Sequence, residues 1–408
     1  MKQVVIIGGG AAGLMAAVTA AEKGACVTVV EKNERPARKL MITGKGRCNV
    51  TNNCNVDTLI ANVPKNPRFL YSAFSGFSAF DTIKFFENSG VALKTERGNR
   101  VFPVSDKAVD IVDALVSSAK KRGAKIINAT ATAILSKDGA VSGVKLQNGE
   151  ILLADSVVVA TGGLSYPVTG STGDGYRFSK ALGHTVTELT PSLVPLMCHE
   201  GFCSHLSGLS LKNVTLSVFG EGKKKPVFSE LGEMLFTHFG ISGPLVLSAS
   251  AHIRYMGKKN YTAVVDLKPA LSLEQLDSRI LRDFSEMQNK DFSNSLDKLL
   301  PKSLIPVIVK LSKIPADRKV NQISREERAE LCRIIKNFTM KITDFRPIEE
   351  AIITSGGVSV KEINPATMES KLVKGLFFAG EVIDVDAYTG GFNLQIAFST
   401  GYAAGSNV

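Results

Sequence analysis

Short apolar runs separated by glycines and polar residues open the chain. Val4–Ile7 is rich in β-branched residues, Leu14–Lys23 is rich in alanine, and Cys26–Val30 is again rich in valine. β-Branched runs favour strands, whereas alanine-rich segments favour helices. The pattern therefore predicts a strand, a helix and a second strand in this order, which is how an α/β domain with a parallel sheet is built.

A glycine cluster, Gly8-Gly9-Gly10-Ala11-Ala12-Gly13, joins the first strand to the helix, and Glu31 ends the second strand. Gly8 permits a tight turn, Gly10 lets a pyrophosphate approach the backbone, and Gly13 lets the helix pack closely on the strand. The helix N-terminus then faces the phosphates, and Glu31 binds ribose hydroxyls but repels a 2′-phosphate. We expect Gly8, Gly10, Ala12, Gly13 and Glu31 to contact a dinucleotide.

The middle of the chain indicates which dinucleotide this is. Three short strands are expected over residues 131–136, 140–147 and 150–154, joined by Asp-Gly and Asn-Gly turns. They lead into an apolar strand at residues 157–159 and then into Ala160-Thr161-Gly162-Gly163. A dehydrogenase domain would use helices as crossovers here, whereas this order resembles the FAD domain of the glutathione-reductase superfamily. The predicted FAD contacts are Ala131, Ala160, Thr161 and Gly162.

The segments at residues 172–175 and 181–183 resemble fumarate-reductase-like flavoproteins, which often attach FAD through a histidine in an early loop. The five histidines of this chain begin at His184. We therefore expect non-covalent FAD.

The C-terminal part repeats a strand, glycine and helix order. A strand is expected at residues 376–379, and Gly390-Gly391 opens a helix that runs to about residue 404. A helix N-terminus aimed at the flavin would stabilise the negative charge of the reduced ring. The alternative is a simple hinge between loop and helix. The predicted contacts are Gly380, Glu381, Gly391, Phe392, Asn393 and Leu394.

A basic, glycine-punctuated segment, residues 35–52, follows the second strand. It has little apolar periodicity, so we expect it to gain order from a ligand and to lie along the pyrophosphate and the flavin. An ordinary basic surface loop is the alternative. The predicted contacts are Lys32, Arg38, Lys39, Gly44, Gly46, Arg47, Cys48 and Asn49, and Lys45 and Arg47 are also candidates to bind an anionic substrate.

Four strings, GKGRCNVTN, LFTHFGISGP, TSGGV and GEVIDVDAYTGGFNLQ, resemble a family of bacterial FAD-binding proteins across the whole chain. Its members include an aminoacetone oxidase and a 3-dehydro-bile acid Δ4,6-reductase. The resemblance implies an α/β fold with a discontinuous Rossmann-like FAD-binding domain, an inserted β-barrel-like region and a helical region. We expect FAD-binding parts at residues 1–190 and 351–408 and an inserted substrate-side region at 191–350.

The composition changes within the inserted region. Residues 191–271 are expected to be mainly β, and residues 272–340 mainly helical. The expected strands cover residues 193–196, 211–219 and 261–267, and the expected helices cover residues 273–283, 297–300, 304–311 and 325–338.

Three residues are candidates for proton transfer. His238 lies in the glycine-rich stretch Phe236–Pro244, where we expect a buried imidazole close to the flavin. A packing role between aromatic residues is the alternative. Lys45 and Tyr388 are the other candidates.

Six cysteines are present without a C-x-x-C, so we expect neither a structural metal site nor a disulfide framework. Cys48 and Cys54 lie near the place of a flavin-linked dithiol, but their spacing is wrong. Cys198 and Cys203 have the right spacing but lie in the insert, where we expect them to be unpaired.

The hydrophobic content and the charge of the chain indicate which kinds of location and partner to expect. Hydrophobic residues make up 44% of the chain, and no apolar run is long enough for a membrane helix. No signal peptide is evident, so we expect a cytoplasmic protein. The net charge of +11 favours anionic partners such as nucleotides, carboxylates, CoA esters or nucleic acid. A basic surface without a dedicated partner is the alternative.

These features predict an FAD-dependent oxidoreductase that transfers hydride to or from a small or medium organic substrate. We favour a reductase, for example of an enone C=C bond, over a flavin amine oxidase that makes hydrogen peroxide. An RNA-associated or redox-sensing flavoprotein ranks third, because the chain lacks an RNA-binding motif. A second G-x-G-x-x-G after a strand is missing, so NADH or NADPH is expected only as a transient electron donor. The sequence does not indicate an oligomeric state.

Overall fold

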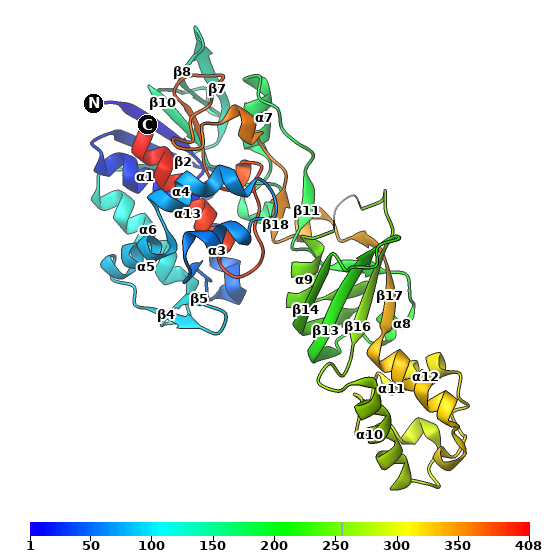
Figure 1. Cartoon of the computed structure of the whole chain (residues 1–408). Helices are drawn as coiled ribbons and strands as arrows, with labels where there is room; N and C mark the ends of the chain where they lie inside the picture. Colours follow the sequence, from blue (N-terminus) through cyan, green and yellow to red (C-terminus); the bar gives the residue numbers. More distant parts are fainter. Residues whose placement is uncertain (254–255) are drawn as a thin grey trace. The chain divides into compact units, whose positions relative to one another are not determined.

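The computed structural model describes residues 1–253 and 256–408 (Figure 1). The chain forms two compact units. Unit 1 consists of Met1–Ser192 and Pro347–Val408, and unit 2 consists of Leu193–Arg346. The chain therefore leaves unit 1 once and returns to it once, with unit 2 between the two crossings.

A five-stranded parallel sheet is the centre of unit 1. Its strands lie in the order β19-β10-β1-β2-β6, with β1 in the middle. Their bounds are Leu376–Phe378 for β19, Ser156–Val159 for β10, Gln3–Ile7 for β1, Cys26–Glu31 for β2 and Lys125–Asn128 for β6. Strands from both ends of the chain thus lie in one sheet, so unit 1 forms only when the C-terminal segment joins the N-terminal one.

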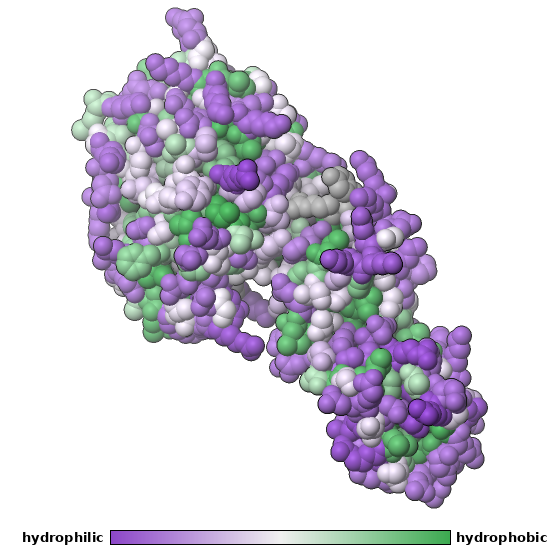
Figure 2. All heavy atoms as spheres, in the orientation of Figure 1, coloured by the Kyte–Doolittle hydropathy of each residue, from purple (hydrophilic) through white to green (hydrophobic). Residues whose placement is uncertain are grey.

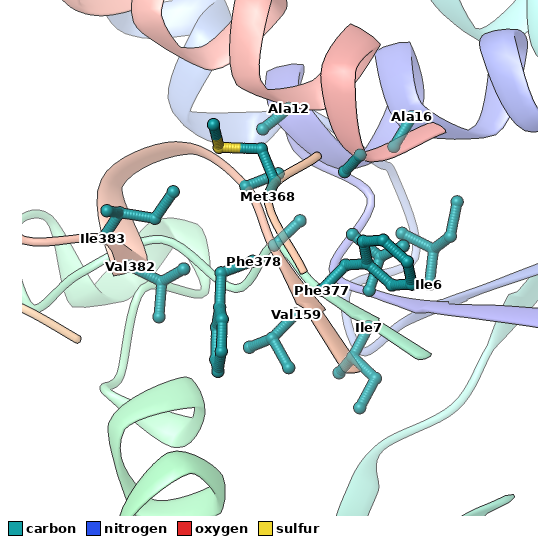
Figure 3. Close-up of a cluster of buried hydrophobic side chains, with 14 of the residues drawn as sticks. Ile6, Ile7, Ala12, Ala16, Val159, Met368, Phe377, Phe378, Val382 and Ile383 are labelled. Carbon is teal, nitrogen blue, oxygen red and sulfur yellow. The ribbon is translucent and has the colours of Figure 1, made fainter. Parts of the chain in front are cut away.

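Two helices pack against this sheet and against each other, α1 (Ala11–Glu22) and α13 (Phe392–Asn407). A Cβ atom on Gly401 would lie 2.4 Å from the carbonyl oxygen of Ala12, and one on Gly405 would lie 2.5 Å from that of Ala16. Glycine at these two places therefore permits direct backbone contact between the helices. Figure 3 shows Ala12 and Ala16 beside the buried side chains of β1, β10 and β19.

Smaller elements complete unit 1. The strands β7 (Ala131–Lys137), β8 (Ala140–Leu146) and β9 (Ile151–Leu153) form the expected antiparallel meander, which leads directly into β10. The other elements are β3 (Thr51–Asn52), β4 (Leu93–Glu96), β5 (Arg100–Pro103), β11 (Thr190–Ser192), β18 (Ile353–Ser355), α2 (Arg38–Ile42), α3 (Val56–Ala61), α4 (Tyr71–Gly76), α5 (Ala79–Asn88), α6 (Ala108–Lys121) and α7 (Asp174–Ala181).

Unit 2 contains a closed six-stranded barrel in the order β12-β15-β14-β13-β16-β17. Its strands are β12 (Leu196–Cys198), β13 (Ser210–Gly220), β14 (Phe228–Thr237), β15 (Gly240–Ser242), β16 (Tyr261–Asp266) and β17 (Phe338–Phe345). The helices of this unit are α8 (Phe202–His205), α9 (Pro244–Ser250), α10 (Leu273–Ser285), α11 (Ile305–Ser312) and α12 (Arg325–Lys336). Ser272 and Ser324 each begin a helix through a capping box, which fixes the starts of α10 and α12.

The predicted fold class is confirmed, but several predicted elements of unit 2 are wrong. The strand expected at residues 193–196 begins only at Leu196, and residues 297–300 form turns instead of a helix. The helix expected to reach residue 338 ends at Lys336, because the next strand begins at Phe338 and closes the barrel. β14, β15 and β17 were not predicted. The burial of β14 alternates only in part, and β15 has three residues, so a short sequence window does not identify them. β17 does alternate between buried and exposed residues over Phe338–Thr343, and this period of two was an available signal.

None of the helices within residues 1–253 and 256–408 combines the length and the apolar character that a membrane crossing requires.

A buried histidine makes the stability of unit 1 depend on pH. His184 is 4% exposed, and its Nε2 lies 2.8 Å from the hydroxyl of Ser370. That hydroxyl already accepts the N–H groups of Leu372 and Val373, so it is placed to donate to a neutral imidazole. Burial lowers the pKa of His184, and Glu362 opposes this effect only in part.

We predict that the free energy of unfolding decreases as the pH falls below about 6.5, because the unfolded chain then binds a proton that the folded chain resists. Replacing His184 with Gln should reduce this dependence. Chemical denaturation of both proteins at pH 8 and pH 5.5, with FAD in constant excess, measures the effect. The exposed His205→Gln variant is the control, and an equal slope in all three proteins would contradict the prediction.

Candidate functional site

A pocket of about 200 Å³ lies in unit 1, where the Gly8–Gly13 turn, the ends of β10 and β19 and the start of α13 meet. All of its lining residues belong to unit 1. Fifteen of the residues predicted to bind FAD line it: Gly8, Gly10, Ala12, Glu31, Lys32, Arg38, Lys39, Ala131, Ala160, Thr161, Gly162, Gly380, Glu381, Asn393 and Leu394. Residues from four distant parts of the sequence therefore meet at one cavity.

The glycine turn has little room for side chains, except at one place that faces the pocket. Gly8 has a φ of +103°, and a Cβ atom there would lie 2.5 Å from the carbonyl oxygen of Ala160. A Cβ atom on Gly13 would lie only 1.9 Å from the carbonyl oxygen of Gly8. A Cβ atom on Gly10, in contrast, would meet nothing within 4 Å. Gly8 and Gly13 thus hold strand and helix together, while Gly10 leaves space beside the N-terminus of α1.

Glu31 is 7% exposed and already has partners in the protein. Its carboxylate accepts the backbone N–H groups of Gly9 and Asn33, both at 2.8 Å, and the side-chain amide of Asn33 at 2.7 Å. Glu31 therefore stabilises the turn itself. A carboxylate has about four acceptor positions, so further acceptor capacity is left on the side that lines the pocket. Asn33 was not among the predicted site residues, although an amide two residues after the acid could have indicated this contact.

An ion pair joins the N-terminal and C-terminal parts of the site. The ammonium of Lys39 lies 2.6 Å from Oε2 of Glu381 and 2.7 Å from the hydroxyl of Ser165. Ser165 in turn donates to Oε1 of Glu381 at 2.8 Å, and the backbone N–H of Thr354 donates to the same atom at 2.9 Å. Ser165 and Thr354 were not predicted, because only the fold brings them to Glu381.

The chemistry of the lining suits a dinucleotide. The space beside Gly10 is open, because a Cβ atom there would meet nothing within 4 Å, so a pyrophosphate can approach the backbone at this point. The N-terminus of α1 opens toward the pocket at Gly10, where phosphates are favoured. Arg38 also lines the pocket and donates to Oδ1 of Asn33, whereas Lys32 is paired with Asp174 at 2.8 Å. Apolar residues such as Ile7 and Ile396 line the remainder. The residues present therefore fit the FAD that the sequence predicts.

The predicted residues of the segment 44–49 do not line this pocket. Arg47 forms ion pairs with Glu96 at 2.5 Å and with Asp106 at 2.6 Å, and its guanidinium lies over the ring of Phe102. Its hydrogen bond to Glu96 raises the pKa of Arg47. We expected Arg47 to bind an anionic ligand, but its guanidinium is already paired with these two carboxylates.

Cys48 is fully buried among apolar side chains, and burial raises the pKa of its thiol to about 12. Lys45 is exposed. The other predicted contacts outside the pocket lining are Gly13, Gly44, Gly46, Asn49, Gly391 and Phe392.

Gly391 lies just outside the pocket lining but shapes the start of α13. It has a φ of +99°, and a Cβ atom there would lie 2.4 Å from the carbonyl carbon of Thr51. Asn393 holds the preceding loop, because its side chain accepts the N–H of Ala387 and donates to the carbonyl of the same residue, both at 2.8 Å. These contacts orient the helix N-terminus that we expect to serve the flavin.

The candidate proton donors lie in different settings. His238 is at the tip of the β14–β15 hairpin in unit 2 and is exposed, so the buried imidazole that we expected is wrong. Its ring meets Phe239 edge-on at 5.0 Å, whereas Phe236 points into the core of the barrel. Tyr388 is half-buried in unit 1, and its backbone N–H donates to the carbonyl of Asn62 at 3.0 Å.

Comparison with known proteins adds independent information. The profile of the HI0933-like protein Rossmann domain family matches residues 2–407. The chain is 31% identical to a 3-dehydro-bile acid Δ(4,6)-reductase of Clostridium scindens, over 99% of this chain and 98% of that protein. It is also 31% identical to a ribosomal RNA dihydrouridine synthase of Escherichia coli, over 99% of this chain and 97% of that protein.

Among solved structures, a 3-ketosteroid-Δ4-(5α)-dehydrogenase from Rhodococcus jostii shares the fold, with a TM-score of 0.53 and 16% identity over 100% of this chain and 96% of that one.

We predict that Gly10→Ala weakens FAD binding more than tenfold, or by about 1.4 kcal/mol or more, while the fold stays intact. The added methyl group meets no protein atom but occupies the space beside the N-terminus of α1. Gly76→Ala is the matched control, since its Cβ atom is also unobstructed and lies away from the pocket. Fluorescence titration of the apoproteins with FAD measures the affinity, and equal affinity in both variants would contradict this use of the pocket.

We predict that acid denaturation releases FAD, and not FMN, from the purified chain. The glycine turn and Glu31 are suited to the adenosine diphosphate half of the cofactor, which FMN lacks. Chromatography and mass spectrometry of the supernatant identify the flavin. FMN in the supernatant, or flavin still attached to a peptide, would show that this assignment of the pocket is wrong.

Proposed function

We propose that this chain, which belongs to the HI0933-like Rossmann-domain family, reduces a carbon–carbon double bond that is conjugated with a carbonyl group. The family and the fold neighbours make it an oxidoreductase of the FAD-binding type. The direction and the substrate are our inference. The direction rests on one observation, namely that two relatives of equal identity over nearly the whole chain carry names that describe the same kind of reduction. The choice of substrate rests on the distribution of charge along the chain.

The names of these two relatives imply one chemical change. A Δ(4,6)-reductase of a 3-dehydro-bile acid saturates a double bond conjugated with the 3-oxo group. Dihydrouridine is uridine in which the ring double bond conjugated with the C4 carbonyl is saturated. Each reaction adds a hydride at the far carbon of the double bond and a proton at the near one. An oxidase is not needed to account for either name, so we favour the reductase.

The distribution of charge favours RNA as the substrate. Residues 193–346 contain 23 Lys and Arg against 16 Asp and Glu, whereas the rest of the chain contains 26 against 22. More than half of the excess positive charge thus lies in the smaller unit. Figure 2 shows a largely hydrophilic face over α10, α11 and α12. A basic unit of this kind suits a polyanion. We therefore propose uridine in ribosomal RNA, although the sequence shows no RNA-binding motif and its patterns favour a small molecule.

The residues of unit 1 would bind and orient the cofactor. Bound FAD would supply the hydride. The Gly8–Gly13 turn would hold its phosphates, and Glu31 would accept from its ribose. The Lys39–Glu381 pair would hold the two walls of the pocket together, and the N-terminus of α13 would favour negative charge on a reduced ring.

The test uses purified chain, NADH or NADPH, and ribosomal RNA transcribed in vitro without modifications. We expect dihydrouridine in the digested RNA at one or a few positions, found by mass spectrometry. A 3-oxo-4,6-diene steroid is offered in parallel. Reduction of the steroid alone would move the substrate to the bile-acid class, and reduction of neither compound would contradict the proposed reaction.

We predict that His238→Gln slows reduction of the accepted substrate by about 10²–10⁴-fold if the imidazole donates the proton, because glutamine keeps the volume but cannot cycle a proton. FAD binding should be unchanged, since His238 is outside the pocket. Tyr388→Phe is the matched test of the second candidate. Rapid mixing of the reduced variants with substrate measures the rate, and a wild-type rate for His238→Gln would transfer the role to Tyr388, Lys45 or water.

A further inference from the structure

Two lysine-rich turns lie side by side at one end of the barrel in unit 2. One turn, residues 221–227, joins β13 to β14, and the other, residues 256–260, precedes β16. β13 lies between β14 and β16 in the barrel, and Gly220 at its end is opposite Tyr261 at the start of β16 (Figure 1). The turns contain five lysines, all of them exposed: Lys223, Lys224, Lys225, Lys258 and Lys259. We call these five residues the lysine cluster.

Hydrogen bonds fix the two turns to each other. The N–H of Glu221 donates to the carbonyl of Asn260 at 2.9 Å, and the Glu221 carboxylate accepts from the side-chain amide of Asn260 at 3.0 Å. The N–H of Lys223 donates to the carbonyl of Gly220 at 3.0 Å, which closes the first turn. Glu221 is the one acidic residue of the two turns, and its carboxylate serves to join them. The five lysines therefore extend from one place on the barrel.

The charges of the lysine cluster differ from those of the helices in the same unit. Eight basic side chains in or beside α10, α11 and α12 form ion pairs with carboxylates of unit 2: Arg279, Arg282, Lys298, Arg318, Lys319, Arg328, Arg333 and Lys336. Within the part of the chain that the structure describes, Lys258 and the three lysines of the first turn form no ion pair. Their positive charge is therefore available to an external anion.

We propose that the lysine cluster binds the phosphate backbone of the ribosomal RNA substrate, an inference that rests on the proposed function. Five charges on two adjacent turns suit a polyanion better than one small anion, because each ammonium can meet a different phosphate. A lysine ammonium is a point charge that holds a phosphate without reading the base. The cluster thus contributes affinity and position, and the choice of the uridine is made elsewhere.

The test measures binding apart from turnover. The full-length protein with oxidised FAD and no reductant is titrated into a labelled fragment of unmodified ribosomal RNA at several KCl concentrations. The triple variant Lys223→Gln, Lys224→Gln and Lys225→Gln should bind about tenfold or more weakly at low salt. The slope of log affinity against log salt should become shallower by about 2–3, because three phosphate contacts are lost.

The matched control is the triple variant Lys302→Gln, Lys310→Gln and Lys313→Gln. These lysines are exposed residues of the same unit, and the change of net charge is the same. The control should alter the affinity by about threefold at most, because charges outside the contact are screened by salt. Circular dichroism and flavin content show that both variants fold and hold the cofactor.

Three results would overturn the proposal. The first is wild-type RNA affinity and salt slope in the variant of the first turn, and the second is an equal loss of affinity in the control. The third is a loss of binding to phosphatidylserine vesicles with unchanged RNA binding, which would assign the cluster to a membrane surface.

An assay of dihydrouridine with NADH or NADPH separates this inference from the proposed function. Dihydrouridine formed by the wild type, with equal RNA affinity in the variant of the first turn, refutes the cluster alone. RNA binding that depends on the cluster, without any dihydrouridine, supports the surface and refutes the reaction.

Discussion

The direct backbone contact between β1, α1 and β10 is the constraint on which the rest of unit 1 depends. Gly13 approaches the carbonyl of Gly8, and Gly8 approaches that of Ala160, more closely than any side chain allows. This contact fixes where α1 begins and therefore where its positive end lies. The same turn leaves open space at Gly10. A dinucleotide pocket thus follows from three backbone segments that pack without intervening side chains.

The C-terminal segment completes the pocket from the other end of the chain. β19 pairs with β10, and α13 lies directly against α1 through Gly401 and Gly405. The Lys39–Glu381 pair, with Ser165 and Thr354, then joins both walls. Breaking one partner of a largely buried ion pair leaves the other without compensation. The N-terminal and C-terminal parts therefore depend on each other, although unit 2 separates them in the sequence.

Local patterns predicted the parts of the fold that local contacts determine. The glycine turn, the meander and the strand at Val157–Val159 follow from spacing and turn residues, and the structure contains them. The wrong predictions concern side chains whose surroundings are set by contacts between residues distant in sequence. The sequence predicted that Arg47 binds an anionic ligand. In the fold, its guanidinium is paired with Glu96 and Asp106, which are distant in sequence. His238 looked buried because aromatic residues flank it, but a hairpin places Phe236 inside and the imidazole outside.

Hydride transfer from a flavin bound in unit 1 to a conjugated double bond is the central proposal for this protein. The most direct measurement is a single turnover. The chain is reduced without oxygen, excess reductant is removed, and unmodified ribosomal RNA is added while the flavin absorbance is followed. We predict that the oxidised flavin spectrum returns as dihydrouridine forms in equal amount. A flavin that stays reduced with the RNA and with a 3-oxo-4,6-diene steroid would contradict it.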